Sequence, residues 1–134
     1  MILIRGPDQA RRIVDPEIRR LVEERFTQVV CGDNYDPEIH GEMIVVEAGD
    51  TLATLEKDSG CPIASNPFDD ARWPDPGFVP ACEYLEDHSR CYEMMFLFSD
   101  DGAGTNFIIP KQQGVDPELL ALCARYAVPV ATSP

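Results

Sequence analysis

Proline and glycine occur along this chain so often that they limit the length of every helix and strand. The 134 residues include 12 prolines and nine glycines. Proline interrupts helices and central strands, and glycine favours turns. The sequence therefore predicts several short elements joined by structured loops. At this length we expect one domain over residues 1–134, with 1–12 and 130–134 poorly ordered.

The tripeptide Asp-Pro-Glu occurs three times, and the copies at Asp15 and Asp116 precede helical patterns. Aspartate is a good N-cap, proline is favoured at the first helical position, and glutamate suits the positive end of a helix. Gly32 ends the first pattern and Pro129 the second. A shorter helix is expected between an N-cap at Asp50 or Thr51 and Gly60. The two main helices are amphipathic, with these apolar positions: Ile18, Leu21, Val22, Phe26, Val29 and Val30, then Leu119, Leu120, Leu122, Cys123 and Tyr126.

Strand patterns are found in two main places. Met43–Val46 is a short apolar run, and Tyr92–Phe98 is β-prone and apolar on both faces. Turn residues at 99–104 and a second apolar run at 107–109 predict a β-hairpin over 92–109. Ile2–Ile4 is an edge strand or a disordered start, and 81–89 is expected to form one or two helical turns. The fold class predicted is α+β, with a small antiparallel sheet and the two main helices packed on one face.

The segment 61–80 is predicted to be a long loop, because it contains five prolines. Loops of this length are commonly functional or packed over the core by their own aromatic residues. Phe68, Trp73 and Phe78 are the aromatics here, and they are candidates for a homo-oligomer interface. With the acidic turn of the hairpin, this loop supplies the predicted binding residues, which are Asp69, Asp70, Trp73, Asp75, Asp100 and Asp101.

The charge of the chain is large and unevenly distributed. The formal net charge is −13 at pH 7. Residues 1–25 hold six basic and five acidic residues, a balance of +1, so residues 26–134 carry −14. Such a charge bears on partners and solubility rather than on fold. It disfavours direct nucleic-acid binding, whose affinity comes mainly from neutralising phosphates.

Five cysteines and two histidines are the remaining residues with distinctive chemistry. Cys82, His88 and Cys91 are spaced C-x5-H-x2-C, which offers zinc ligands but lacks a standard spacing, and a fourth ligand would come from His40 or Cys61. Packed cysteines beside a solvated histidine are the favoured interpretation, so no metal and no cofactor are expected. A cysteine nucleophile with a histidine base is left as an alternative.

Three other site types are disfavoured by the pattern. The turn at 100–104 has the sequence Asp-Asp-Gly-Ala-Gly, which places glycines where alternating calcium ligands belong. Gly102 and Gly104 precede a strand rather than a helix, unlike a phosphate loop. Apolar runs such as Met94–Phe98 are too short for a membrane span, and Arg5 follows Ile4 without a leader-type apolar region. A cytoplasmic protein with reduced thiols is expected.

Several segments resemble small acidic proteins encoded on bacterial integrative and conjugative elements. They are Tyr92–Gly104 (YEMMFLFSDDGAG), Phe107–Lys111 (FIIPK), Gly114–Cys123 (GVDPELLALC) and Met43–Leu52 (MIVVEAGDTL), together with the stretch before Trp73. The resemblance covers most of the chain from Ile13 onward. It implies a mobile-element setting and transfers no catalytic residues to this sequence.

Together these observations favour a binding protein over an enzyme. The expected function is that of an acidic accessory protein of a mobile genetic element, which binds a basic protein partner or occupies its nucleic-acid site as a decoy. A plain solubilising role for the charge is equally consistent with the sequence. The alternative from another class is a small hydrolase or zinc protein that uses Cys82, His88 and Cys91.

Overall fold

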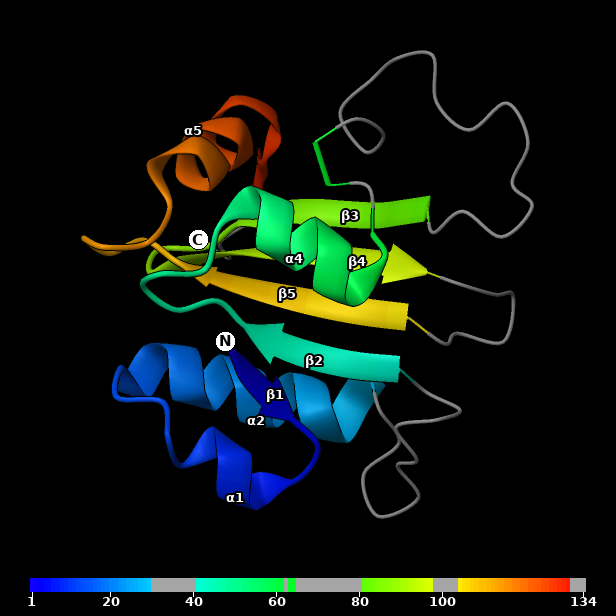
Figure 1. Ribbon diagram of the computed structural model, residues 1–134. Coiled ribbons are helices and arrows are strands. Elements are labelled where there is room, and N and C mark those ends of the chain that lie inside the picture. Colours follow the sequence, from blue (N-terminus) through cyan, green and yellow to red (C-terminus); the bar gives the residue numbers. More distant parts are fainter. Residues whose placement is uncertain (30–40, 62, 65–80, 98–103, 131–134) are drawn as a thin grey trace.

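The computed structural model describes residues 1–29, 41–61, 63–64, 81–97 and 104–130. Helices and strands are interspersed along the chain, and each is short (Figure 1). The elements are β1 (Ile2–Ile4), α1 (Pro7–Ala10), α2 (Pro16–Val29), β2 (Gly41–Val45), α4 (Leu52–Ser59), β3 (Ala81–Asp87), β4 (Cys91–Leu97), β5 (Gly104–Pro110), α5 (Pro117–Tyr126) and β6 (Val128–Pro129).

All six strands form one mixed sheet in the order β1-β2-β5-β4-β3-β6. β4 pairs antiparallel with both β5 and β3, and β1 pairs antiparallel with β2. β2 pairs parallel with β5, and the two-residue edge strand β6 pairs parallel with β3. The central strands β2, β5 and β4 therefore come from distant parts of the sequence.

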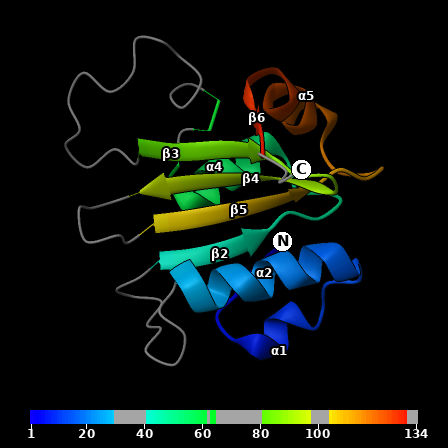
Figure 2. The ribbon, with the colours of Figure 1, turned by 180° about the vertical axis from the view of Figure 1, so that it is seen from behind.

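Helices cover both faces of the sheet. α4 lies in front of the strands in Figure 1, and α2 lies in front of them in Figure 2, which shows the molecule from behind. Alternate residues of β2, β4 and β5 divide between two apolar clusters. Leu55, Phe96, Phe107 and Leu119 belong to the cluster on the α4 and α5 face, whereas Val22 belongs to the cluster on the α1 and α2 face.

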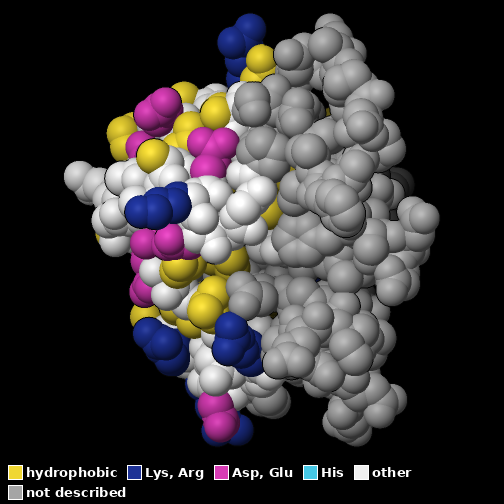
Figure 3. Space-filling model, turned by 45° about the vertical axis from the view of Figure 1, so that its right-hand side comes forward, with side chains coloured by type: hydrophobic (Ala, Val, Ile, Leu, Met, Phe, Trp, Pro, Cys, Tyr) yellow, Lys and Arg dark blue, Asp and Glu magenta, His cyan; other side chains and the backbone are white. Residues whose placement is uncertain are grey.

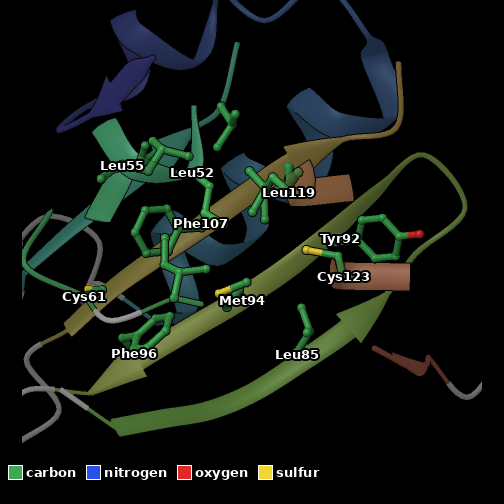
Figure 4. Close-up of a cluster of buried hydrophobic side chains, with 14 of the residues drawn as sticks. Leu52, Leu55, Cys61, Leu85, Tyr92, Met94, Phe96, Phe107, Leu119 and Cys123 are labelled. Atoms are coloured by element: carbon green, nitrogen blue, oxygen red, sulfur yellow. The ribbon is translucent and has the colours of Figure 1, made fainter. Parts of the chain in front are cut away.

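The larger cluster is built from aromatic and aliphatic side chains that α4 and α5 press onto the sheet (Figure 4). Phe96 and Phe107 make an edge-to-face contact with ring centroids 6.0 Å apart. Such pairs contribute beyond their buried area. Cys123 of α5 lies beside Tyr92 of β4 and is fully buried, as the sequence indicated for a cysteine on an apolar helix face.

The helix ends follow the capping chemistry expected from the sequence. Thr51 and Thr54 form a capping box at the start of α4, and Gly60 ends it in the left-handed region with φ of 75°. Asp15 accepts hydrogen bonds from the backbone N–H groups of Glu17 and Ile18 at the start of α2. Gly32, the predicted end of the first main helix, lies outside the described residues. So does the predicted turn of the hairpin, apart from Gly104, which begins β5.

One aspartate links two helix starts. Asp116 Oδ1 accepts from the backbone N–H of Glu118, which caps α5. Its Oδ2 accepts from the backbone N–H of Leu52 at 2.8 Å, at the start of α4. The same carboxylate thus satisfies first-turn N–H groups of two helices, although Leu52 and Asp116 are 64 residues apart.

The predicted sheet was wrong in size, strand direction and cover. The sheet has six strands and is mixed, whereas a small antiparallel sheet was expected. The helices cover both faces, whereas both were expected on one face. The reason is that the central strands bury side chains on both faces of the sheet, so each face needs its own covering layer. The strands of the predicted 92–109 hairpin do pair antiparallel, and β1 is an edge strand.

The prediction of helical turns over 81–89 was also wrong, because Ala81–Asp87 is strand β3. Aspartate and glutamate are depleted in strands, so the acidic residues of this segment do not favour a strand locally. Pairing along the whole length of β4 outweighs that local preference, as tertiary context often does. No helix in the described part of the chain is both long and apolar enough to cross a membrane.

Candidate functional site

A fully buried glutamate lies in the middle of the central strand β4. Residues 91, 93 and 95 of β4 face the α2 side of the sheet, and Glu93 has no exposed surface. Its neighbours across the strands are Glu86 of β3 and Ile108 of β5. A buried carboxylate is costly unless it is paired and hydrogen-bonded, so the surroundings of Glu93 need an explanation.

Glu93 is held by donors from three different elements, α2, β3 and β5. Arg25 of α2 donates through Nε to Oε2 at 2.8 Å and through Nη2 to Oε1 at 3.2 Å. The Tyr84 hydroxyl donates to Oε2 at 2.9 Å, and Asn106 Nδ2 donates to Oε2 at 3.1 Å. The arginine contact is bidentate, which is the strongest common form of such a pair.

His88 and Glu86 complete the group on the side of the β3–β4 turn. His88 Nε2 lies 2.9 Å from Glu93 Oε1 and 3.6 Å from the nearer oxygen of Glu86. The side chain of His88 is 18% exposed and that of Glu86 is 34% exposed, so this side of the group faces solvent. We call the six residues Arg25, Tyr84, Glu86, His88, Glu93 and Asn106 the Glu93 cluster.

The cluster keeps Glu93 ionised. Burial alone would raise the pKa of Glu93, but the hydrogen bonds from Arg25 and Asn106 and the charge of Arg25 outweigh burial and lower this pKa below its usual value. Burial likewise lowers the pKa of Arg25, and its hydrogen bond to Glu93 more than compensates, so that the arginine pKa is raised. Glu93 therefore acts as an acceptor and is poorly suited to remove protons from a substrate.

Tyr84 and Asn106 are similarly fixed by the carboxylate. Burial and the charge of Glu93 raise the pKa of Tyr84 well above its ordinary value, so the phenol stays protonated and donates. Asn106 is 3% exposed, and its Oδ1 has no hydrogen-bond partner in the described structure. An acceptor left in this condition is uncommon in folded proteins and marks a place where a donor could be accommodated.

A small pocket lies beside the cluster, between α2 and the β3–β4 turn. Its volume is about 200 Å³. Ile18, Leu21 and Cys91 supply apolar surface, and charged or polar side chains supply the rest: Glu17, Arg20, Glu24, His88, Ser89 and Arg90. Arg90 is paired with Asp15 through Nη2 at 2.6 Å. His88 belongs both to this pocket and to the Glu93 cluster, and so connects the two.

The predicted binding residues lie outside the described residues. They are Asp69, Asp70, Trp73, Asp75, Asp100 and Asp101. His40 also lies outside the described residues.

The structure does not bring Cys82, His88 and Cys91 together. Cys82 pairs with Phe96 near the open end of the β3–β4 pair, whereas Cys91 begins β4 beside the turn. Five residues along a strand span about 17 Å, which separates the two cysteine backbones by far more than a zinc site allows. His88 lies near the turn, where its backbone N–H donates to the carbonyl of Cys91.

The described thiols have the character of buried apolar groups. Burial, followed by the charge of Glu93, raises the pKa of Cys91 to about 12. Burial also raises the pKa of Cys61. A thiolate is the nucleophilic form of cysteine, so raised pKa values make these side chains poor nucleophiles at neutral pH.

Another trio in the cluster has the donor types of a metal site. One ligand atom from each of Glu86, His88 and Glu93 lies within 4.8 Å of the other two. The sequence pattern singled out His88 but not Glu93. The signal it missed was an acidic residue in the middle of a strand predicted to be buried on both faces, because such a residue must have partners.

Comparisons with protein-family models, with curated proteins and with solved structures find no match for this chain.

Proposed function

We propose that this protein is a non-enzymatic, acidic binding protein whose partner is a basic protein. The observation that carries the proposal is the net charge of −14 over residues 26–134. A field of this size attracts positively charged surfaces and accelerates their association. The resemblance to proteins of bacterial integrative and conjugative elements supports a mobile-element setting for this function, and we propose that the protein acts in the cytoplasm.

The chemistry of the Glu93 cluster supports binding over catalysis. Its carboxylate is neutralised by Arg25 and accepts hydrogen bonds, and the buried thiol of Cys91 is protonated. These groups lack the proton affinities that general acid–base or nucleophilic catalysis needs near neutral pH. The alternative function, a hydrolase that uses Cys82, His88 and Cys91, is weakened further by the separation of Cys82 from the other two residues.

The described surface is not uniformly acidic. In the face shown in Figure 3, basic and acidic side chains alternate across the part that the structure describes. On this face, the described elements therefore do not offer a partner a uniformly acidic surface. We therefore propose that the predicted binding residues of the 61–80 loop and the hairpin turn contact the partner. The described elements support the segments that carry these residues.

A pull-down at two salt concentrations tests the proposal. The full chain is used as bait in a lysate of a bacterium carrying a related element, and the bound proteins are identified at about 0.1 M and 0.5 M salt. Salt screens exposed charges, so basic partners recovered at low salt should be lost at high salt. Partners that are neither basic nor sensitive to salt would overturn the proposal.

Two variants of equal charge separate docking from net charge. Asp69→Asn/Asp70→Asn/Asp75→Asn changes the loop, and Glu23→Gln/Asp58→Gln/Glu118→Gln changes exposed acids of α2, α4 and α5. Each variant raises the net charge from −13 by three to −10. A greater loss of partner binding in the loop variant than in the helix variant supports a docking surface in the loop.

Two further outcomes separate other forms of the function. Competition between this chain and DNA or RNA for the bound protein would identify the decoy form of the function. An oligomer of this chain, detected by light scattering, would instead indicate the homo-oligomer predicted from Phe68, Trp73 and Phe78.

A further inference from the structure

Three donor atoms of the Glu93 cluster, one each from Glu86, His88 and Glu93, converge near the β3–β4 turn. His88 Nε2 lies 2.9 Å from Glu93 Oε1 and 3.6 Å from Glu86 Oε2. Imidazole nitrogen and carboxylate oxygen are the donor types that bind zinc and related ions. The combination also differs from a cluster of surface acids, because it includes a histidine and a carboxylate that is fully buried.

The spacing of these atoms suits a small divalent ion. Zinc binds nitrogen and oxygen at about 2.0–2.2 Å, so tetrahedral ligands lie about 3.4 Å from one another. The two distances from His88 Nε2 lie on either side of this value, and all three donor atoms are within 4.8 Å of one another. We propose that Glu86, His88 and Glu93 form a binding site for one divalent transition-metal ion, with Zn²⁺ as its probe.

The rest of the cluster has the arrangement of an outer shell around such a site. Arg25, Tyr84 and Asn106 each donate to Glu93, and two of these three donate only to Oε2. Metal-binding carboxylates are commonly oriented by hydrogen bonds of this kind. The donors thus fix the Glu93 carboxylate so that Oε1 faces His88. Bound to the ion through Nε2, the imidazole of His88 carries its proton on Nδ1.

Charge and access also favour a cation at this position. Two carboxylates and one guanidinium give the cluster a formal charge of −1 with neutral histidine, so a divalent ion is attracted despite Arg25. Glu86 and His88 are partly exposed, and His88 lines the neighbouring pocket of about 200 Å³. An ion can therefore reach the three donors from solvent, and water or a pocket ligand can fill a further coordination position.

Zinc titration of the full chain tests the site. The protein is purified without an affinity tag, treated with chelator, and titrated with Zn²⁺ by calorimetry and by thermal unfolding. We expect one saturable site and a rise in Tm with zinc concentration. His88→Gln and Glu86→Gln should each weaken zinc binding by more than about 100-fold, the upper limit for outer-shell changes. Asp58→Asn, which removes an exposed carboxylate of α4, should leave it unchanged.

Two further measurements separate this site from the alternatives. Tyr84→Phe keeps all three ligands and removes one donor to Glu93, so it should weaken zinc binding by about 10- to 100-fold. Cobalt(II) bound in place of zinc should show the weak visible bands of nitrogen and oxygen ligation. An intense thiolate band that disappears in Cys82→Ser, zinc binding that survives His88→Gln, or absence of saturable binding by Zn²⁺, Co²⁺ and Mn²⁺ would each overturn the proposal.

Discussion

Replacing Arg25 by methionine isolates the energetic role of the buried ion pair. The substitution removes both hydrogen bonds to Glu93 and leaves a carboxylate with no exposed surface and no neighbouring guanidinium. Breaking a buried pair in this way costs about 3–5 kcal/mol. Tyr84 and Asn106 still donate to Glu93 in the variant, so we expect the lower end of that range.

The size of the effect can be measured by urea denaturation and thermal unfolding. A loss of about 3 kcal/mol corresponds to a fall in Tm of about 12 °C, at about 4 °C per kcal/mol for a chain of this length. The dependence of the unfolding free energy on urea should not change, because the same surface is exposed. A cycle with Glu93→Gln and the double variant measures the coupling directly, and we expect about 2 kcal/mol.

Arg90→Met is the matched control. Arg90 also donates through Nε and Nη2 to one carboxylate, that of Asp15, but its side chain is 60% exposed. Exposed pairs contribute little, so the control should unfold at nearly the temperature of the parent protein. Equal losses in Arg25→Met and Arg90→Met would refute the reasoning, because burial would then not distinguish the two pairs.

Three further predictions concern other parts of the molecule. Asp116→Ala removes the acceptor of the Glu118 and Leu52 N–H groups, so it should lower the free energy of unfolding by about 1–2 kcal/mol in urea denaturation; a value near zero would contradict the capping role. The hydrogen bond from Arg90 lowers the pKa of Asp15 below 3.8, so the resulting stability is present above 3.8 and is lost as the pH falls through the lower, folded-state value. Arg90→Met should therefore shift the acid unfolding midpoint to higher pH. If NMR shows that the Asp15 carboxyl titrates in Arg90→Met as it does in the parent protein, the prediction is wrong. Cys61, Cys91 and Cys123 are buried, so all three should alkylate slowly at pH 8 until the protein is unfolded, and rapid modification of any one in the folded protein would be inconsistent with its burial.

Local features were predictable from the sequence because neighbouring residues determine them. Short-range chemistry determines the helix caps at Asp15, Thr51 and Asp116 and the helix end at Gly60. It also determines the pairing of β4 with β5. The parallel pairing of β2 with β5 was not predictable in the same way, because it joins segments about 60 residues apart that carry no mutual signal. β3 was missed because its acidic residues obscured a strand that pairing with β4 stabilises.

The candidate site was only partly accessible for the same reason. His88 was identified as a residue with distinctive chemistry, and Glu93 could have been, since a charge inside a buried strand requires partners. Its main partner could not be identified from the sequence, because Arg25 lies 68 residues earlier and no local pattern links the two positions. Only the packing of α2 on the sheet selects that one arginine.

The shared carboxylate of Asp116 has a consequence for how the molecule opens. The hydrogen bonds at the starts of α4 and α5 depend on the same side chain, so fraying of one helix start leaves the other without part of its cap. The two helices also pack into one apolar cluster on the same face of the sheet. Their amides should therefore exchange with solvent hydrogen as one cooperative unit, with a common free energy of opening, although 57 residues separate the end of α4 from the start of α5.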